Sequence, residues 1–181
     1  MKYYLLFFFA LFSLTILSCG SSKSTATDGE LKALTDLVNN RNFSVVSEWA
    51  YPTTSRAMQR ASQLLGPGNN NGGSISLVGN TNFLTISGDS ITSFLPYFGE
   101  RQMGGAYGGA DSAIEFEGVM ENYKAVKNKK DGYDISFVAK SNSENFAVNI
   151  TLFPNLNADI SLNGSSRSFI RYSGTAKSIE K

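Results

Sequence analysis

Few residues of this chain could do covalent or metal chemistry. Histidine is absent, and Cys19 is the single cysteine. Because histidine is the commonest general base and transition-metal ligand, its absence excludes Ser-His-Asp triads, Cys-His pairs and histidine-based zinc or iron sites. Three kinds of chemistry remain: carboxylate catalysis, a serine-lysine pair, and a cation held by oxygen ligands.

The only acidic cluster consists of Glu115, Glu117 and Glu121. Alternation along a strand puts Glu115 and Glu117 on one face, where they could act as paired glycosidase carboxylates or hold a cation. Neighbouring carboxylates on one strand face are more typical of a solvated exterior. A serine and a lysine at catalytic spacing occur only at the end of the chain. We therefore expect no enzyme, no catalytic residue, no bound metal and no cofactor.

Cys19 directly follows an apolar run that begins at Tyr3 and is preceded by the positive charge of Lys2. This arrangement is typical of a bacterial lipoprotein signal, and the run is shorter than the ~20 apolar residues of a membrane-spanning helix. We expect residues 1–18 to be the signal peptide, Cys19 to be lipidated, and residues 19–27 to form a flexible tether. The protein then belongs to the cell envelope, anchored to the outer membrane and facing the periplasm.

The mature chain is formally neutral, because removal of Lys2 leaves 16 − 1 = 15 basic residues against 15 acidic ones. Binding to nucleic acid requires a basic surface that displaces counterions, so we expect no nucleic-acid partner. Lipidation of Cys19 leaves no thiol for a disulfide. The expected partners are the membrane, through the lipid at Cys19, and a small envelope ligand or another protein.

A short helix and a strand open the folded part of the chain. Leucines at helical spacing predict a helix over Asp28–Asn40, with Asp28 as its N-cap. A strand follows over 43–51, and period two places Trp49 on its buried face. A second short helix is predicted over 53–65, before a loop rich in asparagine and glycine.

From Ser74 onward, short alternating runs are separated by turn residues. The predicted strands are 75–78, 83–87, 91–95, 114–120, 123–128, 133–139, 146–152, 158–162 and 169–175. Strands that recur about every ten residues, joined by tight turns, indicate an antiparallel barrel or sandwich. We expect residues 28–181 to form one mainly β domain: an N-terminal helix followed by a small, lipocalin-like antiparallel β-barrel of about eight strands.

The most unusual local sequence of the mature chain is 95–99, LPYFG. Pro96 cannot donate to a β-ladder, so the strand must end there, and a glycine-rich loop over 103–109 follows. Tyr97, Phe98 and Tyr107 could form the mouth of a ligand site on the barrel. The alternative is a corner plug, in which Tyr97 and Phe98 seal the core.

Two three-residue segments, 89–91 and 111–113, match an acceptor pattern for O-linked sugars. Ser90 and Ser112 are the acceptor residues of these segments. Both serines fall at predicted turns or loop ends, where a glycan could be attached. We predict Ser90 and Ser112 as O-glycosylation sites.

The LPYFG run, an acidic strand near residues 114–116 and a terminal IRYSG strand at 170–174 resemble a family of lipoproteins of unknown function from Gram-negative gut and oral anaerobes. The resemblance covers residues 43–179. It implies a cell-envelope protein with a small helix-plus-barrel domain, and it implies no activity.

Together these observations favour a lipid-anchored, non-catalytic binding module for a small envelope ligand, either a lipid or a glycan. One alternative is a structural or assembly subunit of an envelope complex, for which we expect a filled barrel and an exposed apolar patch. The other is a carboxylate-dependent hydrolase, for which two acids must converge in a cleft.

Overall fold

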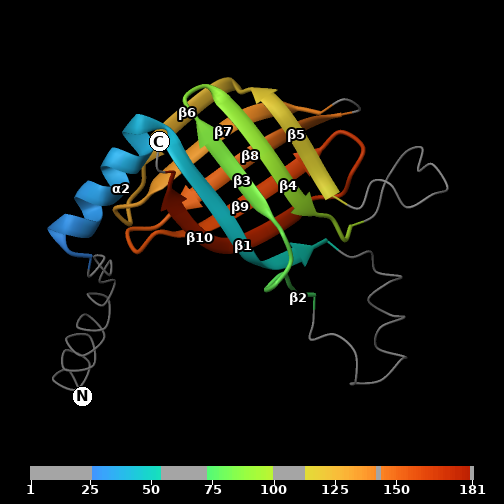
Figure 1. The fold of residues 1–181 in the computed structure, drawn as a ribbon, viewed down its shortest axis with the longest axis horizontal. Coiled ribbons are helices and arrows are strands. Elements are labelled where there is room, and N and C mark those ends of the chain that lie inside the picture. Colours follow the sequence, from blue (N-terminus) through green and yellow to red (C-terminus); the bar gives the residue numbers. More distant parts are fainter. Residues whose placement is uncertain (1–25, 54–72, 100–112, 142–143, 180–181) are drawn as a thin grey trace, which may run out of the picture.

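The structure of the protein is a computed structural model, and it describes residues 26–53, 73–99, 113–141 and 144–179 (Figure 1). Within these ranges, the helix α2 (Asp28–Asn40) precedes the strands. The strands are β1 (Asn42–Pro52), β2 (Ile75–Ser76), β3 (Phe83–Ser87), β4 (Ser90–Pro96), β5 (Ala113–Val119), β6 (Glu121–Lys127), β7 (Tyr133–Lys140), β8 (Asn145–Leu152), β9 (Asn157–Gly164) and β10 (Ile170–Ser178).

All strand pairs are antiparallel, in the order β5-β4-β3-β1-β10-β9-β8-β7-β6, and the short β2 also pairs with β1. The N-terminal strand β1 lies between β3 and β10, in the middle of this order. The sheet curls into a nearly closed barrel of nine strands, and its two edge strands are β5 and β6 (Figure 1). The predicted fold class, a mainly β chain with one N-terminal helix and a small antiparallel barrel, is confirmed.

The start of the helix α2 is fixed by hydrogen bonds in its first turn. The Thr27 hydroxyl accepts from the Glu30 backbone N–H, and the Thr27 backbone N–H donates to the Glu30 carboxylate at 2.8 Å. These hydrogen bonds lower the pKa of Glu30 and satisfy two groups that a helix start leaves unpaired. The N-cap is therefore Thr27 and not Asp28, because only Thr27 has the extended backbone that the cap requires.

The interior of the barrel is filled by side chains. Inward residues alternate with outward ones along the strands, most regularly along β7, β8 and β9. The largest of the fully buried side chains are Tyr172, Phe43, Phe146, Leu34, Leu77, Leu84, Ile86, Ile91, Leu95, Ile114, Ile135 and Ile150. They belong to one continuous core that also takes in the buried face of α2, so the described interior is packed and not hollow.

The alternation of β1 breaks at a β-bulge. Ser47 pairs with Gly174 and Trp49 pairs with Ser173, so Glu48 is an extra residue with no partner on β10. Every residue after a bulge changes face. Phe43 is buried as predicted, but Trp49 is 41% exposed and Ala50 occupies the core position. The prediction that Trp49 is buried is wrong, because the bulge turns its side chain outward.

Several earlier predictions concern residues outside the described ranges. These are the signal peptide 1–18, Cys19 and most of the tether, the second helix from residue 54 onward, Tyr107 and Ser112. No helix in the described part of the chain is long and apolar enough to cross a membrane.

Candidate functional site

The LPYFG segment lies at the end of the barrel opposite α2. The strand β4 ends at Pro96, as predicted. The Tyr97 side chain then turns into the core, where only 9% of it is exposed, and its hydroxyl donates to the Ser168 carbonyl at 3.1 Å. Phe98 is 43% exposed. In the described residues Tyr97 therefore ties the end of β4 to the segment that enters β10.

A buried ion pair lies beside Tyr97. The Arg167 Nε atom is 3.0 Å from the Glu144 carboxylate, and both side chains are almost fully buried. Arg167 also donates to the Ala113 carbonyl at 2.9 Å, and its guanidinium carbon lies 5.2 Å from the centre of the Tyr97 ring. One guanidinium thus links the turn after β7, the start of β5 and the LPYFG segment. A charge pair buried in this way holds three chain segments together.

Two phenols are buried at this end. The Tyr172 hydroxyl donates to the Pro96 carbonyl at 2.8 Å. Burial raises the pKa of Tyr97 and strongly raises the pKa of Tyr172, because the charged phenolate would lose its hydration. Neither phenol faces open solvent, so among the described residues Tyr97 and Tyr172 are packed in the core. A ligand contact by Tyr97, Phe98 or Tyr107 stays a prediction.

The outward side of β1 and β10 carries a cluster of aromatic and polar side chains that the sequence analysis missed. Trp49 stands opposite Ser173, and Tyr51 stands opposite Arg171. The Arg171 guanidinium carbon lies 4.6 Å from the centre of the Tyr51 ring, and the Tyr51 and Ser173 hydroxyls lie 3.3 Å apart. Phe169, just before β10, is 45% exposed. We call the surface made by Trp49, Tyr51, Phe169, Arg171 and Ser173 the Trp49 face.

The bulge that creates the Trp49 face is held by contacts from distant parts of the chain. The Ser47 backbone N–H donates to the Asn82 side chain at 2.7 Å, and Asn82 is itself buried. The Glu48 carbonyl accepts from the Leu77 backbone N–H at 2.8 Å. A Cβ atom on Gly174 would overlap the Val46 carbonyl, so only glycine fits there. Bulges often redirect a side chain beside a functional site, and this one is fixed on both sides.

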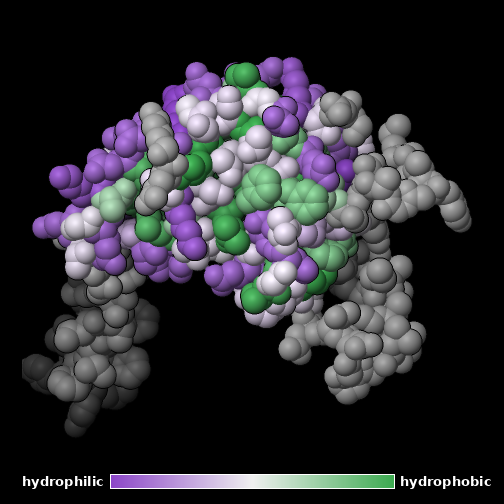
Figure 2. Space-filling model, in the orientation of Figure 1, coloured by the Kyte–Doolittle hydropathy of each residue, from purple (hydrophilic) through white to green (hydrophobic). Residues whose placement is uncertain are grey.

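The Trp49 face combines flat apolar rings with hydrogen-bonding groups. Arg171 is exposed, and its guanidinium makes no ion pair with any described residue. Ser76 of β2 pairs with Trp49 from the other side and is exposed too. Figure 2 shows that apolar side chains lie among polar ones on the visible side of the barrel. Trp, Tyr and Arg are the residues that dominate binding energies at protein interfaces.

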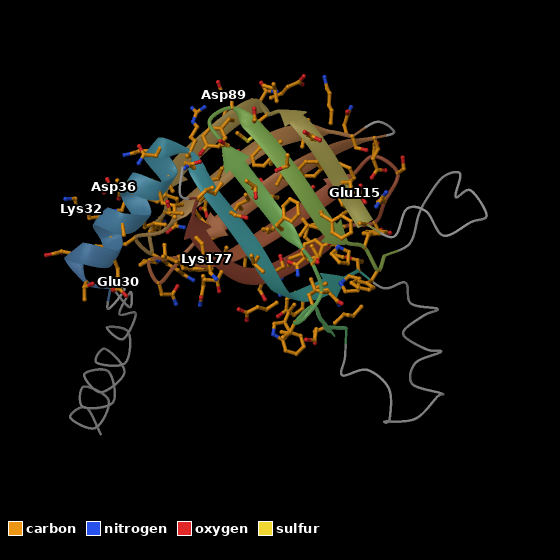
Figure 3. The ribbon with its side chains drawn as sticks, in the orientation of Figure 1. Glu30, Lys32, Asp36, Asp89, Glu115 and Lys177 are labelled. Carbon is orange, nitrogen blue, oxygen red and sulfur yellow. The ribbon has the colours of Figure 1, made fainter. Side chains whose placement is uncertain are left out.

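A shallow groove of about 490 Å³ lies between α2 and the barrel. It is lined by Ala33, Asp36, Leu37, Asn40, Asn42, Leu156 and Ser178. Figure 3 shows Asp36 on the helix and Lys177 at the neighbouring end of β10. The groove is at the end of the barrel opposite LPYFG, where the Asn42 side-chain amide donates to the Ile179 carbonyl at 2.8 Å.

The three residues of the predicted acidic cluster are all exposed. Glu115 and Glu117 are exposed on the outer face of β5, opposite the buried Phe116, and Figure 3 shows Glu115 near one end of that strand. Glu121 forms an exposed ion pair with Lys140. Within the described ranges, no three histidine, cysteine or acidic residues come close enough to hold a metal ion.

Ser90 is exposed at the start of β4, in the turn where Asp89 pairs with Arg41. A turn of this kind is accessible to a modifying enzyme, so glycosylation of Ser90 stays a prediction.

Comparison with known proteins gives a family and a fold. A family model for a domain of unknown function, DUF4251, matches residues 26–176. The fold is similar to the crystal structure of a DUF4251 family protein from Bacteroides eggerthii, with a TM-score of 0.57 and 14% sequence identity over 83% of this chain and 88% of that chain. No curated protein matches this chain.

Proposed function

The chain belongs to the DUF4251 family of domains of unknown function, and we propose that this member is a lipid-anchored, non-catalytic binding protein of the cell envelope. The proposed anchor is a lipid on Cys19, reached through the tether 19–27, and the proposed location is the outer membrane, facing the periplasm. The lipoprotein-like signal at residues 1–18 supports this location.

The observation that carries the binding function is the outward position of Trp49. A tryptophan costs free energy when it is left in water, yet a bulge braced by Asn82 and Gly174 turns this one out of the core. Its neighbours Tyr51 and Arg171 offer a further ring and a cation. We therefore propose that the ligand binds on the Trp49 face and not inside the barrel.

The packed interior supports this choice of surface. A calyx that holds a lipid needs an open cavity, as in barrels that enclose one small ligand. Here the inward side chains of the described strands are inaccessible to solvent and contact one another. A ligand carried by such a barrel has to bind on its outside.

A structural or assembly subunit is the second candidate, because Val119 and Val126 are 67% and 62% exposed near the two free ends of the sheet. Exposed apolar residues beside unpaired strand edges are suited to a protein partner. Under this alternative, Val126 and not Trp49 would be required for association.

Co-sedimentation tests the two candidates. The full chain in detergent micelles is mixed with insoluble envelope material from the cells that express it. We expect the wild type and Val126→Ser to sediment with the envelope material, and Trp49→Ala to remain in solution. If Val126→Ser abolishes sedimentation and Trp49→Ala does not, the assembly function replaces the binding function. If no protein sediments, binding through the Trp49 face is contradicted.

A further inference from the structure

We infer that the Trp49 face binds an acidic oligosaccharide, with one sugar ring stacked on Trp49 and a carboxylate on Arg171; this inference rests on the proposed binding function. The fold and the family leave the class of ligand open.

The outward-facing rings are spaced along the strands. Trp49 and Tyr51 are two residues apart on β1, which corresponds to about 6.6 Å. Phe169, just before β10, extends the row of outward residues beyond Arg171, and the Thr53 N–H donates to the Phe169 carbonyl at 3.1 Å. Successive pairs along the two strands are therefore Trp49 with Ser173, Tyr51 with Arg171, and Thr53 with Phe169. This surface is elongated, as a chain-like ligand requires.

The chemistry of the rings suits a sugar. The C–H bonds on one face of a pyranose are weakly positive, and the face of an indole ring is electron-rich, so the two surfaces attract each other and exclude water. Ser76 and Ser173 are the cross-strand partners of Trp49, and their hydroxyls and that of Tyr51 can exchange hydrogen bonds with sugar hydroxyls. A fatty acyl chain would exclude water from these hydroxyls without offering them hydrogen bonds in return.

The charge of Arg171 selects the kind of sugar. Its guanidinium lies over the Tyr51 ring, which fixes the position of the cation, and it makes no ion pair with any described residue. A guanidinium presents several donors in a planar fork that matches a carboxylate. Arg171 belongs to the pair next to Trp49, about one sugar ring away. A uronic-acid-type sugar therefore complements the face in both shape and charge.

Calorimetric titration of the full chain in detergent micelles tests the inference. The probes are a short oligogalacturonate, a neutral galacto-oligosaccharide of the same length, and an acidic peptide, oligoglutamate. We expect the oligogalacturonate to bind at least about tenfold more tightly than the neutral probe, and added salt to reduce this difference. Oligoglutamate, which lacks a sugar face, is expected to bind at least about tenfold more weakly than oligogalacturonate.

Three variants of the Trp49 face and two matched controls divide the contributions. Trp49→Ala should weaken oligogalacturonate binding at least about tenfold, and Trp49→Phe should restore part of it. Arg171→Gln should remove the preference for the acidic probe and leave neutral binding within about twofold. The matched controls Val126→Ser and Lys124→Gln, which alter an exposed apolar residue and a lysine on β6, should change neither affinity. Thermal melting of each variant confirms that it folds.

Equal binding of the neutral and acidic probes would overturn the role of Arg171. If oligoglutamate binds as tightly as oligogalacturonate, or if no oligosaccharide binds, the carbohydrate class is wrong. In that case the proposed binding function still stands if Trp49→Ala abolishes sedimentation with envelope material. If sedimentation is also independent of Trp49, both the inference and the proposed function fail.

Discussion

Gly174 of β10 lies against the backbone of Val46 of β1 so closely that no side chain fits between the two strands. This contact is the counterpart of the bulge, because Gly174 is the residue that faces Ser47 where the register shifts. A larger residue would push β1 away and disturb the outward turn of Trp49. The glycine of the terminal IRYSG run is therefore required by the close approach of β1 to β10.

Gly174→Ala is expected to lower the free energy of unfolding by about 2 kcal/mol or more, because the added methyl group overlaps the backbone of β1. Urea denaturation of the full chain in detergent measures the change. Gly29→Ala is the matched control, since its Cβ on α2 meets only Thr27 at 4.0 Å. It should leave stability unchanged or raise it by up to about 1 kcal/mol. Equal effects of the two substitutions would contradict the account of the bulge.

The two aromatic residues of LPYFG are expected to differ. Tyr97→Ala should cost about 3–5 kcal/mol, because it removes a buried ring and its hydrogen bond to Ser168. Phe98→Ala should cost less than about 1 kcal/mol, since that side chain is largely exposed. Thermal melting of both variants checks this. A small effect of Tyr97→Ala would instead favour the ligand-mouth hypothesis for this segment.

Alkaline pH is expected to destabilise the fold through the buried phenols. The pKa values of Tyr97 and Tyr172 are raised above the unfolded value of about 10, so the stability they contribute is complete below that pH. It is lost as the pH rises from about 10 towards the folded pKa values. Tyrosinate absorbance should show these phenols ionising only as the protein unfolds, and Tyr172→Phe should move alkaline unfolding to higher pH. If all the tyrosines ionise at about pH 10 while the protein stays folded, the prediction that the buried phenols destabilise the fold at alkaline pH is contradicted.

The predicted lipid anchor can be checked directly. Mass spectrometry of protein from the membrane fraction should find an acylated Cys19 at the N-terminus. Cys19→Ala should accumulate as an unprocessed precursor, because signal cleavage of this type follows lipidation. A mature N-terminus at any other residue, or a Cys19 without acyl mass, would disprove the anchor.

The parts of the fold that depend on local sequence were predictable. The extent of the helix follows from leucine spacing, although its N-cap is Thr27 and not the predicted Asp28, and the strands β7 to β9 follow from regular alternation. The orientation of Trp49 was not predictable, because a bulge leaves no clear local signal. Its causes are Asn82 and Gly174, which are far away along the chain.

The same distinction holds for the candidate site. Pro96 correctly marks the end of β4, since proline cannot donate to the ladder. The partner of Tyr97 is the carbonyl of Ser168, and such a contact depends on how the barrel closes. The Trp49 face was missed for this reason too: Tyr51, Phe169 and Arg171 become neighbours only when β1 pairs with β10.

Fluorescence of Trp49 tests the central claim most directly, because Trp49 is the single tryptophan of the chain. In the free protein we predict emission typical of a solvent-exposed indole and ready quenching by acrylamide. With saturating oligogalacturonate, the emission should shift to shorter wavelength and the quenching should fall. Emission typical of a buried indole in the free protein would contradict the outward turn of Trp49, and quenching that stays the same with every ligand and envelope fraction would contradict binding on the Trp49 face.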